Sequence, residues 1–309
     1  MALTLVLALG SCRNSGEKQA TDPKTVGETL TLEHQLGTVT VQKNPKRVVA
    51  LDYVSLENLH ELGIEVIGIP KSNLPNYLNQ YADKGKVTDL GTLFDVDYEL
   101  LNELEPDVIF MSTRMETNYA ELSKIAPTIF IAQDQDRVLE SFEENLDIFG
   151  QLFDKEKEVD RAVTRIKAKI GALEEVVSES GSSALIIMHN KGKFSAFGEN
   201  SRFGIIHSLF GFKQAVEDLD RSRHGQAVSN EFIQAADPDY LFMVDRSAVV
   251  NKQATNKEEI ENVLVQRTKA YKNGNVVYLD PEAWYISGGG ITSLELMIAE
   301  VADNFKPNK

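Results

Sequence analysis

One pattern of residues occurs twice along this chain and constrains its architecture. The pattern is E-x6-P-D-x6-R, and it runs from Glu99 to Arg114 and again, 132 positions later, from Glu231 to Arg246. In both copies an apolar helical stretch leads into Pro-Asp, a strand-like run follows, and the arginine comes last. The duplication predicts two similar α/β lobes.

Each arginine of the repeat comes just past a predicted buried strand. A polar residue in this position lies at the carboxyl end of the strand, where open α/β sheets bind ligands. We therefore expect Arg114 and Arg246 to face a shared cleft, one from each lobe, as in a binding protein that closes on its ligand. The expected fold class is α/β, with two Rossmann-like lobes joined by one long helix and the ligand cleft between the lobes.

The composition is that of a soluble globular protein with an acidic balance. The chain has 309 residues, enough for two domains of ordinary size, of which 42% are hydrophobic and 26% charged. The formal net charge of −15 argues against nucleic acid as a partner and against a basic membrane-binding face. A cleft that gathers arginines is more informative in such a chain, because it runs against the global sign.

Cys12 is the single cysteine, so an intramolecular disulfide is excluded. It follows the residues Leu-Gly-Ser and an apolar run that is too short to span a bilayer. This order matches the lipobox of bacterial lipoproteins, in which the cysteine is lipidated; the alternative is a stray buried cysteine. Residues 1–12 are therefore predicted to be a lipoprotein signal segment and residues 13–28 a flexible tether. The protein is expected outside the cytoplasm, anchored by lipid.

The N-terminal α/β lobe is expected to span residues 29–152. It opens with a hairpin around Gly37, and its later strands alternate with helices, which predicts a parallel sheet. The first helix is expected to begin at the N-cap Ser55 and to end at Gly63.

Residues 153–180 are expected to form a helix that links the lobes. Apolar residues recur at steps of four and three and therefore share one face: Val159, Val163, Ile166, Ile170, Leu173 and Val177. A lone surface helix or one strand of a coiled coil would show the same stripe. A single such helix between two α/β halves favours a rigid linker.

The C-terminal α/β lobe is expected to span residues 181–309, with strands at ALIIMHN, FSAFG, YLFMV and NVVYLD. Its last helix follows the glycine run 288–290, and Thr292 and Glu295 have the spacing of a capping box. A glycine run before a helix resembles a phosphate cradle. No lysine follows and the GxGxxG spacing is missing, so the run is interpreted as a turn.

Three arginines are candidates for ligand binding. Arg114 and Arg246 come from the repeat, and Arg202 lies in a turn-rich segment of the second lobe. Guanidinium groups stay charged and donate in a planar fork, so three of them suit an oxygen-rich anion. The alternative is that each pairs with a carboxylate on this acidic surface.

Two further residues have side chains suited to a metal. His224 lies in a polar, glycine-containing loop, where it can serve as a metal ligand, as a general base or as a solvated side chain. Tyr285 lies between the last strand and the last helix, and its oxygen suits ferric iron once the metal displaces the proton. Its neighbour Trp284 either caps the core or lines the cleft.

No motif in this sequence gives positive evidence for an enzyme. GxSxG, HExxH, Walker A and CxxC patterns are absent, and the remaining histidines show no ligand spacing. A hydrolase that uses His224 as its base would lack a nucleophile motif and an orienting third group.

The chain resembles the class III solute-binding proteins of ABC importers, which take up siderophores, haem and cobalamin. The lipobox, the duplicated block and the linking helix carry this resemblance over residues 30–309. Within the class, the second half resembles the catecholate-siderophore binders in its segments SRFG, HGQAVSNEFI, ADPDYLFMVDR and YLDPEAWYISGGG.

The resemblance implies a role for each candidate residue. It assigns the catecholate oxygens to Arg114, Arg202 and Arg246, and ferric iron, when the siderophore is tetradentate, to His224 and Tyr285. Iron would arrive as a siderophore complex, with no intrinsic cofactor. Haem or cobalamin is the alternative cargo; three arginines argue against haem, whose pocket should be mostly apolar.

The resemblance also implies a membrane partner. Proteins of this class dock on their permease through one surface glutamate per lobe, and the repeat places Glu99 and Glu231 at equivalent positions. An ordinary first-turn glutamate of a helix is compatible with the same positions. We expect a monomer that docks on an ABC permease.

Overall fold

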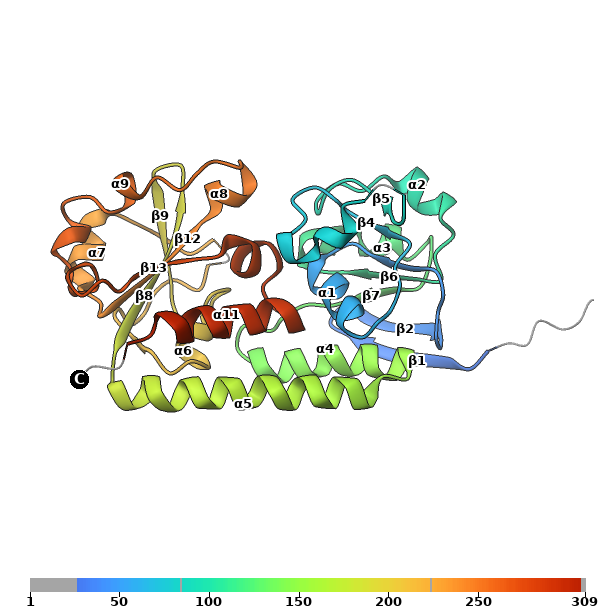
Figure 1. Cartoon of the computed structure of the whole chain (residues 1–309). Coiled ribbons are helices and arrows are strands. Elements are labelled where there is room, and N and C mark those ends of the chain that lie inside the picture. Colours follow the sequence, from blue (N-terminus) through green and yellow to red (C-terminus); the bar gives the residue numbers. More distant parts are fainter. Residues whose placement is uncertain (1–26, 84, 223, 307–309) are drawn as a thin grey trace, which may run out of the picture.

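The computed structural model describes residues 27–83, 85–222 and 224–306 as two α/β lobes side by side (Figure 1). The predicted signal segment with Cys12, and the tether up to residue 26, lie outside the described residues. The long helix α5 (Glu156–Ser180) runs beneath both lobes and connects them. Among the described residues, no helix combines the length and hydropathy of a membrane span.

The first lobe holds a parallel sheet of five strands, in the order β5-β4-β3-β6-β7. An antiparallel hairpin stands apart from it, formed by β1 (Thr29–His34) and β2 (Gly37–Gln42). The sheet strands are β3 (Val48–Ala50), β4 (Gly68–Ile69), β5 (Thr88–Asp89), β6 (Val108–Met111) and β7 (Thr128–Phe130). The helices are α1 (Tyr53–Glu61), η1 (Asn76–Tyr81), α2 (Tyr98–Glu103), η2 (Thr113–Asn118), α3 (Tyr119–Leu122) and α4 (Val138–Phe153).

The second lobe holds a mixed sheet in the order β11-β9-β8-β12-β13, with β10 beside the start of β8. β9 runs antiparallel to β8 and to β11, whereas β12 runs parallel to both β8 and β13. The strands are β8 (Ser183–Asn190), β9 (Lys193–Phe197), β10 (Lys213–Gln214), β11 (Gln226–Val228), β12 (Tyr240–Asp245) and β13 (Val276–Leu279). The helices are α6 (Ile205–Ser208), α7 (Asn230–Ala236), α8 (Arg246–Val250), α9 (Lys257–Ile260), η3 (Val265–Arg267), α10 (Lys269–Lys272), η4 (Glu282–Ser287) and α11 (Ile291–Asn304).

The two copies of the repeat fold alike. Asp97 caps α2 and Ser229 caps α7, each through a side-chain oxygen that accepts from the backbone three residues on. Glu105 and Asp237 then turn the chain with φ of 40° and 39°. The residues that share a role are 132 positions apart.

The aspartate of each Pro-Asp pair ties its strand to the central strand beside it. Asp107 accepts from the backbone N of Arg47, just before β3, at 2.8 Å. Asp239 accepts from the backbone N of Ser183, at the start of β8, at 2.9 Å. The same local device therefore sets the strand register in both lobes.

One predicted helix start and one predicted capping pair are wrong. α1 begins at Tyr53, because Asp52 is the cap and its Oδ1 accepts from the backbone N of Ser55 at 2.8 Å. α11 begins after the glycine run, as predicted, but its N-cap is Gly290, whose backbone N donates to the hydroxyl of Ser293 at 3.1 Å. Glu295, predicted for that role, instead accepts from Arg165 on α5 at 2.6 Å.

The linking helix buries the predicted stripe, except that Val163 is only half-buried. α5 packs against α4 and α11, and α11 reaches across to α1 of the first lobe (Figure 1). One core cluster therefore contains residues of both lobes, such as Phe110, Ile166 and Phe242.

Candidate ligand-binding cleft

A cavity of about 970 Å³ lies between the lobes. Parallel strands of both sheets end at it, as the repeat predicts. The structure brings all the predicted cleft residues to its wall: Arg114, Arg202, His224, Arg246, Trp284 and Tyr285.

Two arginines from different lobes meet at one backbone oxygen. Nη2 of Arg114 donates to the carbonyl oxygen of Tyr285 at 2.8 Å, and Nη2 of Arg202 donates to the same oxygen at 2.9 Å. Arg114 lies in η2 just past β6, and Arg202 lies in the loop after β9. Two guanidinium groups at one oxygen create a positive centre in a chain of net charge −15.

The third arginine contacts the phenol of the same tyrosine. Nε of Arg246 donates to Oη of Tyr285 at 2.7 Å, and its Nη1 donates to Oδ1 of Asn190 at 3.2 Å. The guanidinium groups of Arg202 and Arg246 also lie 4.4 and 5.5 Å from the centroid of the tyrosine ring, within the range of cation–π attraction. Tyr285 is therefore the point at which the three predicted arginines converge.

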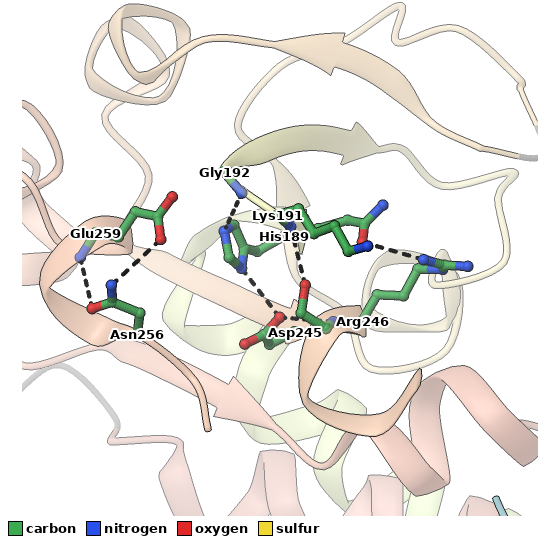
Figure 2. A network of polar contacts seen from close by, with 9 residues as sticks. His189, Lys191, Gly192, Asp245, Arg246, Asn256 and Glu259 are labelled. Atoms are coloured by element: carbon green, nitrogen blue, oxygen red, sulfur yellow. Dashed lines mark hydrogen bonds and ion pairs between the residues drawn. The ribbon is translucent and has the colours of Figure 1, made fainter. Parts of the chain in front are cut away.

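A buried histidine–aspartate pair supports Arg246 from behind (Figure 2). The Nε2 atom of His189 accepts from the backbone N of Gly192 at 3.0 Å, so Nδ1 carries the proton and donates to Asp245 at 3.1 Å. The same Asp245 oxygen accepts from the backbone N of Ser247 at 3.0 Å and caps α8. These bonds tie the end of β8, which carries Asn190, to the end of β12, which Arg246 directly follows.

The segment that carries Tyr285 is fixed on both sides. The indole Nε1 of Trp284 donates to Glu300 on α11 at 2.8 Å, and burial raises the pKa of that glutamate. On the other side, Ser287 donates to Glu57 of the first lobe at 3.2 Å. Glu57 is fully buried, and burial raises its pKa to about 7.

His224 reaches the cavity from a different segment. It precedes β11 in an exposed loop, and its backbone N donates to the hydroxyl of Ser222 at 3.2 Å. His224 and Tyr285 therefore line one cavity from segments 61 positions apart, at residues 224 and 285.

The two glutamates of the repeat lie elsewhere. Glu99 and Glu231 are exposed in the first turns of α2 and α7, and neither belongs to the described wall of the cavity. A hydrogen bond from the hydroxyl of Ser229 holds the pKa of Glu231 below its usual value.

Sequence reasoning did not assign two basic residues to the wall. Lys193 and Arg221 add two cations, and Arg221 lies 3.5 Å from Asp136 across the cleft. Asp52, the buried cap of α1, lines the cavity from the first lobe, and burial raises its pKa. Lys193 follows a tight turn after β8. It would have been found if every polar residue close to the end of a predicted strand had been treated as a candidate for the wall.

Comparison with known proteins gives consistent relatives. The profile of a family described as periplasmic binding protein matches residues 48–283. The chain is 40% identical over 312 residues to the petrobactin-binding protein YclQ of Bacillus subtilis, covering 99% of this chain and 97% of YclQ. It is 34% identical over 282 residues to the ferric-anguibactin-binding protein FatB of Vibrio anguillarum, covering 90% of this chain and 88% of FatB.

Solved structures of similar proteins share the fold. The crystal structure of YclQ superposes with a TM-score of 0.87 at 42% identity, covering 90% of this chain and 98% of YclQ. The periplasmic catecholate-siderophore binding protein VctP of Vibrio cholerae gives a TM-score of 0.85 at 36% identity, covering 89% of this chain and 100% of VctP.

Proposed function

The chain belongs to the periplasmic binding protein family, and from this premise we propose that it binds a ferric siderophore of the catecholate type and passes it to an ABC importer. Proteins of this family bind solutes and are not enzymes, so His224 is not assigned as a hydrolytic base. The observation that carries the proposal is the convergence of three arginines on Tyr285 inside the cavity between the lobes.

The charge of the cleft supports an anionic, oxygen-rich cargo. Arg114, Arg202 and Arg246 come from three segments of an acidic protein, and guanidinium groups bind ionised oxygens more strongly than neutral ones. A cavity of about 970 Å³ also accommodates a ligand of siderophore size. Among the similar proteins, YclQ is named for binding petrobactin, FatB for ferric anguibactin and VctP for a catecholate siderophore.

Two donor side chains on the wall support iron ligation by the protein. A tetradentate siderophore leaves two positions on ferric iron open, and we assign these to His224 and Tyr285. The phenol oxygen of Tyr285 accepts a hydrogen bond from Nε of Arg246 at 2.7 Å, so this donor oxygen lies beside a cation at the cavity wall.

The test compares two denticities. Binding is measured by quenching of Trp284, the single tryptophan, with a tetradentate and a hexadentate ferric catecholate. The double variant His224→Ala, Tyr285→Phe should weaken the tetradentate complex far more than the hexadentate one. Equal losses for both complexes would contradict iron ligation by the protein, and tight binding of haem or cobalamin in place of either complex would replace the cargo assignment.

Delivery to the membrane completes the proposal. We assign lipid attachment to Cys12, docking on the permease to Glu99 and Glu231, and a monomeric state to the protein outside the cytoplasm. Several relatives are described as lipoproteins or periplasmic proteins, among them YhfQ of Bacillus subtilis. A Cys12→Ala variant that stays with the membrane fraction would contradict the anchor.

A further inference from the structure

Phe94 is an aromatic side chain that the fold displays at the mouth of the cavity. It lies between β5 and α2 in the first lobe and lines the cavity, yet 69% of its surface is exposed. It is the most exposed of the large hydrophobic side chains in the described part of the chain. A single exposed apolar side chain needs no explanation by itself, so the argument depends on its surroundings.

Hydrogen bonds hold the turn that carries Phe94. Oγ1 of Thr92 accepts from the backbone N of Phe94 at 3.1 Å and from that of Asp95 at 2.9 Å. The backbone N of Thr92 in turn donates to the carbonyl of Asp95 at 2.9 Å. Gly91 begins the loop with φ of 101°, and a Cβ there would lie 2.9 Å from the carbonyl oxygen of Asp95.

The neighbours of Phe94 point the other way. Leu93 and Val96 are each only 4% exposed and anchor the loop in the core. The ring of Phe94 is thus held out of the core by a turn whose backbone is hydrogen-bonded at Thr92, Phe94 and Asp95. The backbone that presents the ring is thus ordered before a ligand binds, which lowers the cost of binding.

The position of the ring relative to the arginines suggests its partner. The guanidinium of Arg114 lies 6.0 Å from the centroid of the Phe94 ring, and the same arginine donates to Tyr285 inside the cleft. A planar anionic ring whose oxygens face Arg114 would lie within reach of the Phe94 ring, stacked or edge to face. An aliphatic chelator offers no such ring.

Resting on the function proposed above, we propose that Phe94 packs on an aromatic ring of the bound siderophore and makes the cleft prefer aromatic over aliphatic ferric chelates. Aromatic pairs add to the burial of apolar area when they stack offset or edge to face. Phe94 would thus select by the shape of the chelating group, whereas the arginines select by its charge.

The experiment compares Phe94→Leu, which is apolar without a ring, with Phe94→Trp, which keeps a ring. Val263→Ala is the matched control, because Val263 is 60% exposed and does not belong to the described wall of the cavity. Affinities for a ferric bis-catecholate and for ferric citrate are measured by calorimetry, since Phe94→Trp adds a second fluorophore. Thermal unfolding checks that each variant is folded.

Phe94→Leu should weaken binding of the bis-catecholate about three- to tenfold, Phe94→Trp should stay within about twofold of wild type, and Val263→Ala should change nothing. The affinity for ferric citrate should be the same in all three variants as in the wild type. Full affinity of Phe94→Leu would overturn the inference, as would equal losses for both chelates. Intact binding with reduced uptake in a reconstituted importer would instead make Phe94 a permease contact. Wild-type protein that binds no ferric catecholate overturns the proposed function, and this inference with it.

Discussion

Glu57 on α1 accepts two hydrogen bonds from Ser293 on α11, one from the backbone N at 3.0 Å and one from the hydroxyl at 2.6 Å. The two residues belong to different lobes and are both fully buried. Glu57 also holds Ser287, two positions after Tyr285, so the contact between the lobes is continuous with the wall of the cleft.

The first prediction concerns the pH dependence of stability. Burial raises the pKa of Glu57 from 4.5 to about 7, so between these values the unfolded chain has lost a proton that the folded chain keeps. The free energy of unfolding should therefore fall as pH rises from about 5 to 8, by up to roughly 3 kcal/mol from this residue. Glu57→Gln should remove this contribution to the pH dependence of the free energy of unfolding. Urea unfolding at both pH values measures it, and an unchanged pH slope in the variant would contradict it.

The second prediction compares two glycines. A Cβ on Gly290 would lie 1.9 Å from Oε1 of Glu57, whereas a Cβ on Gly171 of α5 meets nothing within 4 Å. Gly290→Ala should cost about 1–3 kcal/mol by overpacking, and Gly171→Ala should add about 0.5–1 kcal/mol through helix propensity. Because φ at Gly290 is −96°, backbone strain does not confuse the comparison. Thermal unfolding of both variants provides the measurement, and equal stability would refute it.

The third prediction concerns the pair behind Arg246. His189→Ala removes the imidazole donor of the buried Asp245 and leaves it only the backbone N of Ser247, so the protein should lose about 1–3 kcal/mol of stability and bind the ferric catecholate more weakly. His189→Asn keeps a donor near the Nδ1 position and should recover most of the affinity. Titrations are carried out well below the unfolding temperature of each variant. Unaltered affinity in a folded His189→Ala protein would show that Arg246 needs no such support.

The fourth prediction concerns charge in the cleft. Arg246→Ala leaves an anionic oxygen of the cargo and the phenol of Tyr285 short of a donor, at a cost of about 1.5–3 kcal/mol in binding. Arg246→Lys should recover only part of this, because the planar fork is lost. The dissociation constants of the two variants decide it, and wild-type affinity in Arg246→Ala would mean that the cleft is wrongly assigned.

The fifth prediction separates docking from binding. Changing Glu99 and Glu231 together to lysine should leave siderophore affinity intact, since both are exposed and lie off the cavity wall. Uptake by a reconstituted importer should fall, and more steeply at low salt, because exposed ion pairs are screened. If uptake persists in the double variant, both residues are only helix-start glutamates.

The sequence predicted those parts of the fold that depend on local patterns. The repeat placed Arg114 and Arg246 at the ends of equivalent strands, and the apolar stripe located α5. Asp52 and Ser55 are both good caps, so the start of α1 could not be decided from residue types alone. The two-residue strand β10 has no periodicity to detect.

The cleft was less predictable because its supports are distant in sequence. Glu57 and Ser293 are 236 positions apart, and no local signal marks a glutamate that will be buried against another lobe. The exposure of Phe94 depends likewise on the turn around it and not on its neighbours' hydropathy. The arginines were found because duplication and resemblance supplied information that one local segment lacks.

The carbonyl oxygen of Tyr285 accepts hydrogen bonds from both Arg114 and Arg202, so it competes with any cargo for these two donors. A ligand oxygen can take over these donors only if it is a better acceptor than a neutral amide. Ionised oxygens meet this condition, because charge-assisted hydrogen bonds are roughly twice as strong as neutral ones. Uncharged solutes would gain nothing by the exchange. The backbone of the protein therefore sets the minimum hydrogen-bond strength that a ligand needs to engage the two arginines.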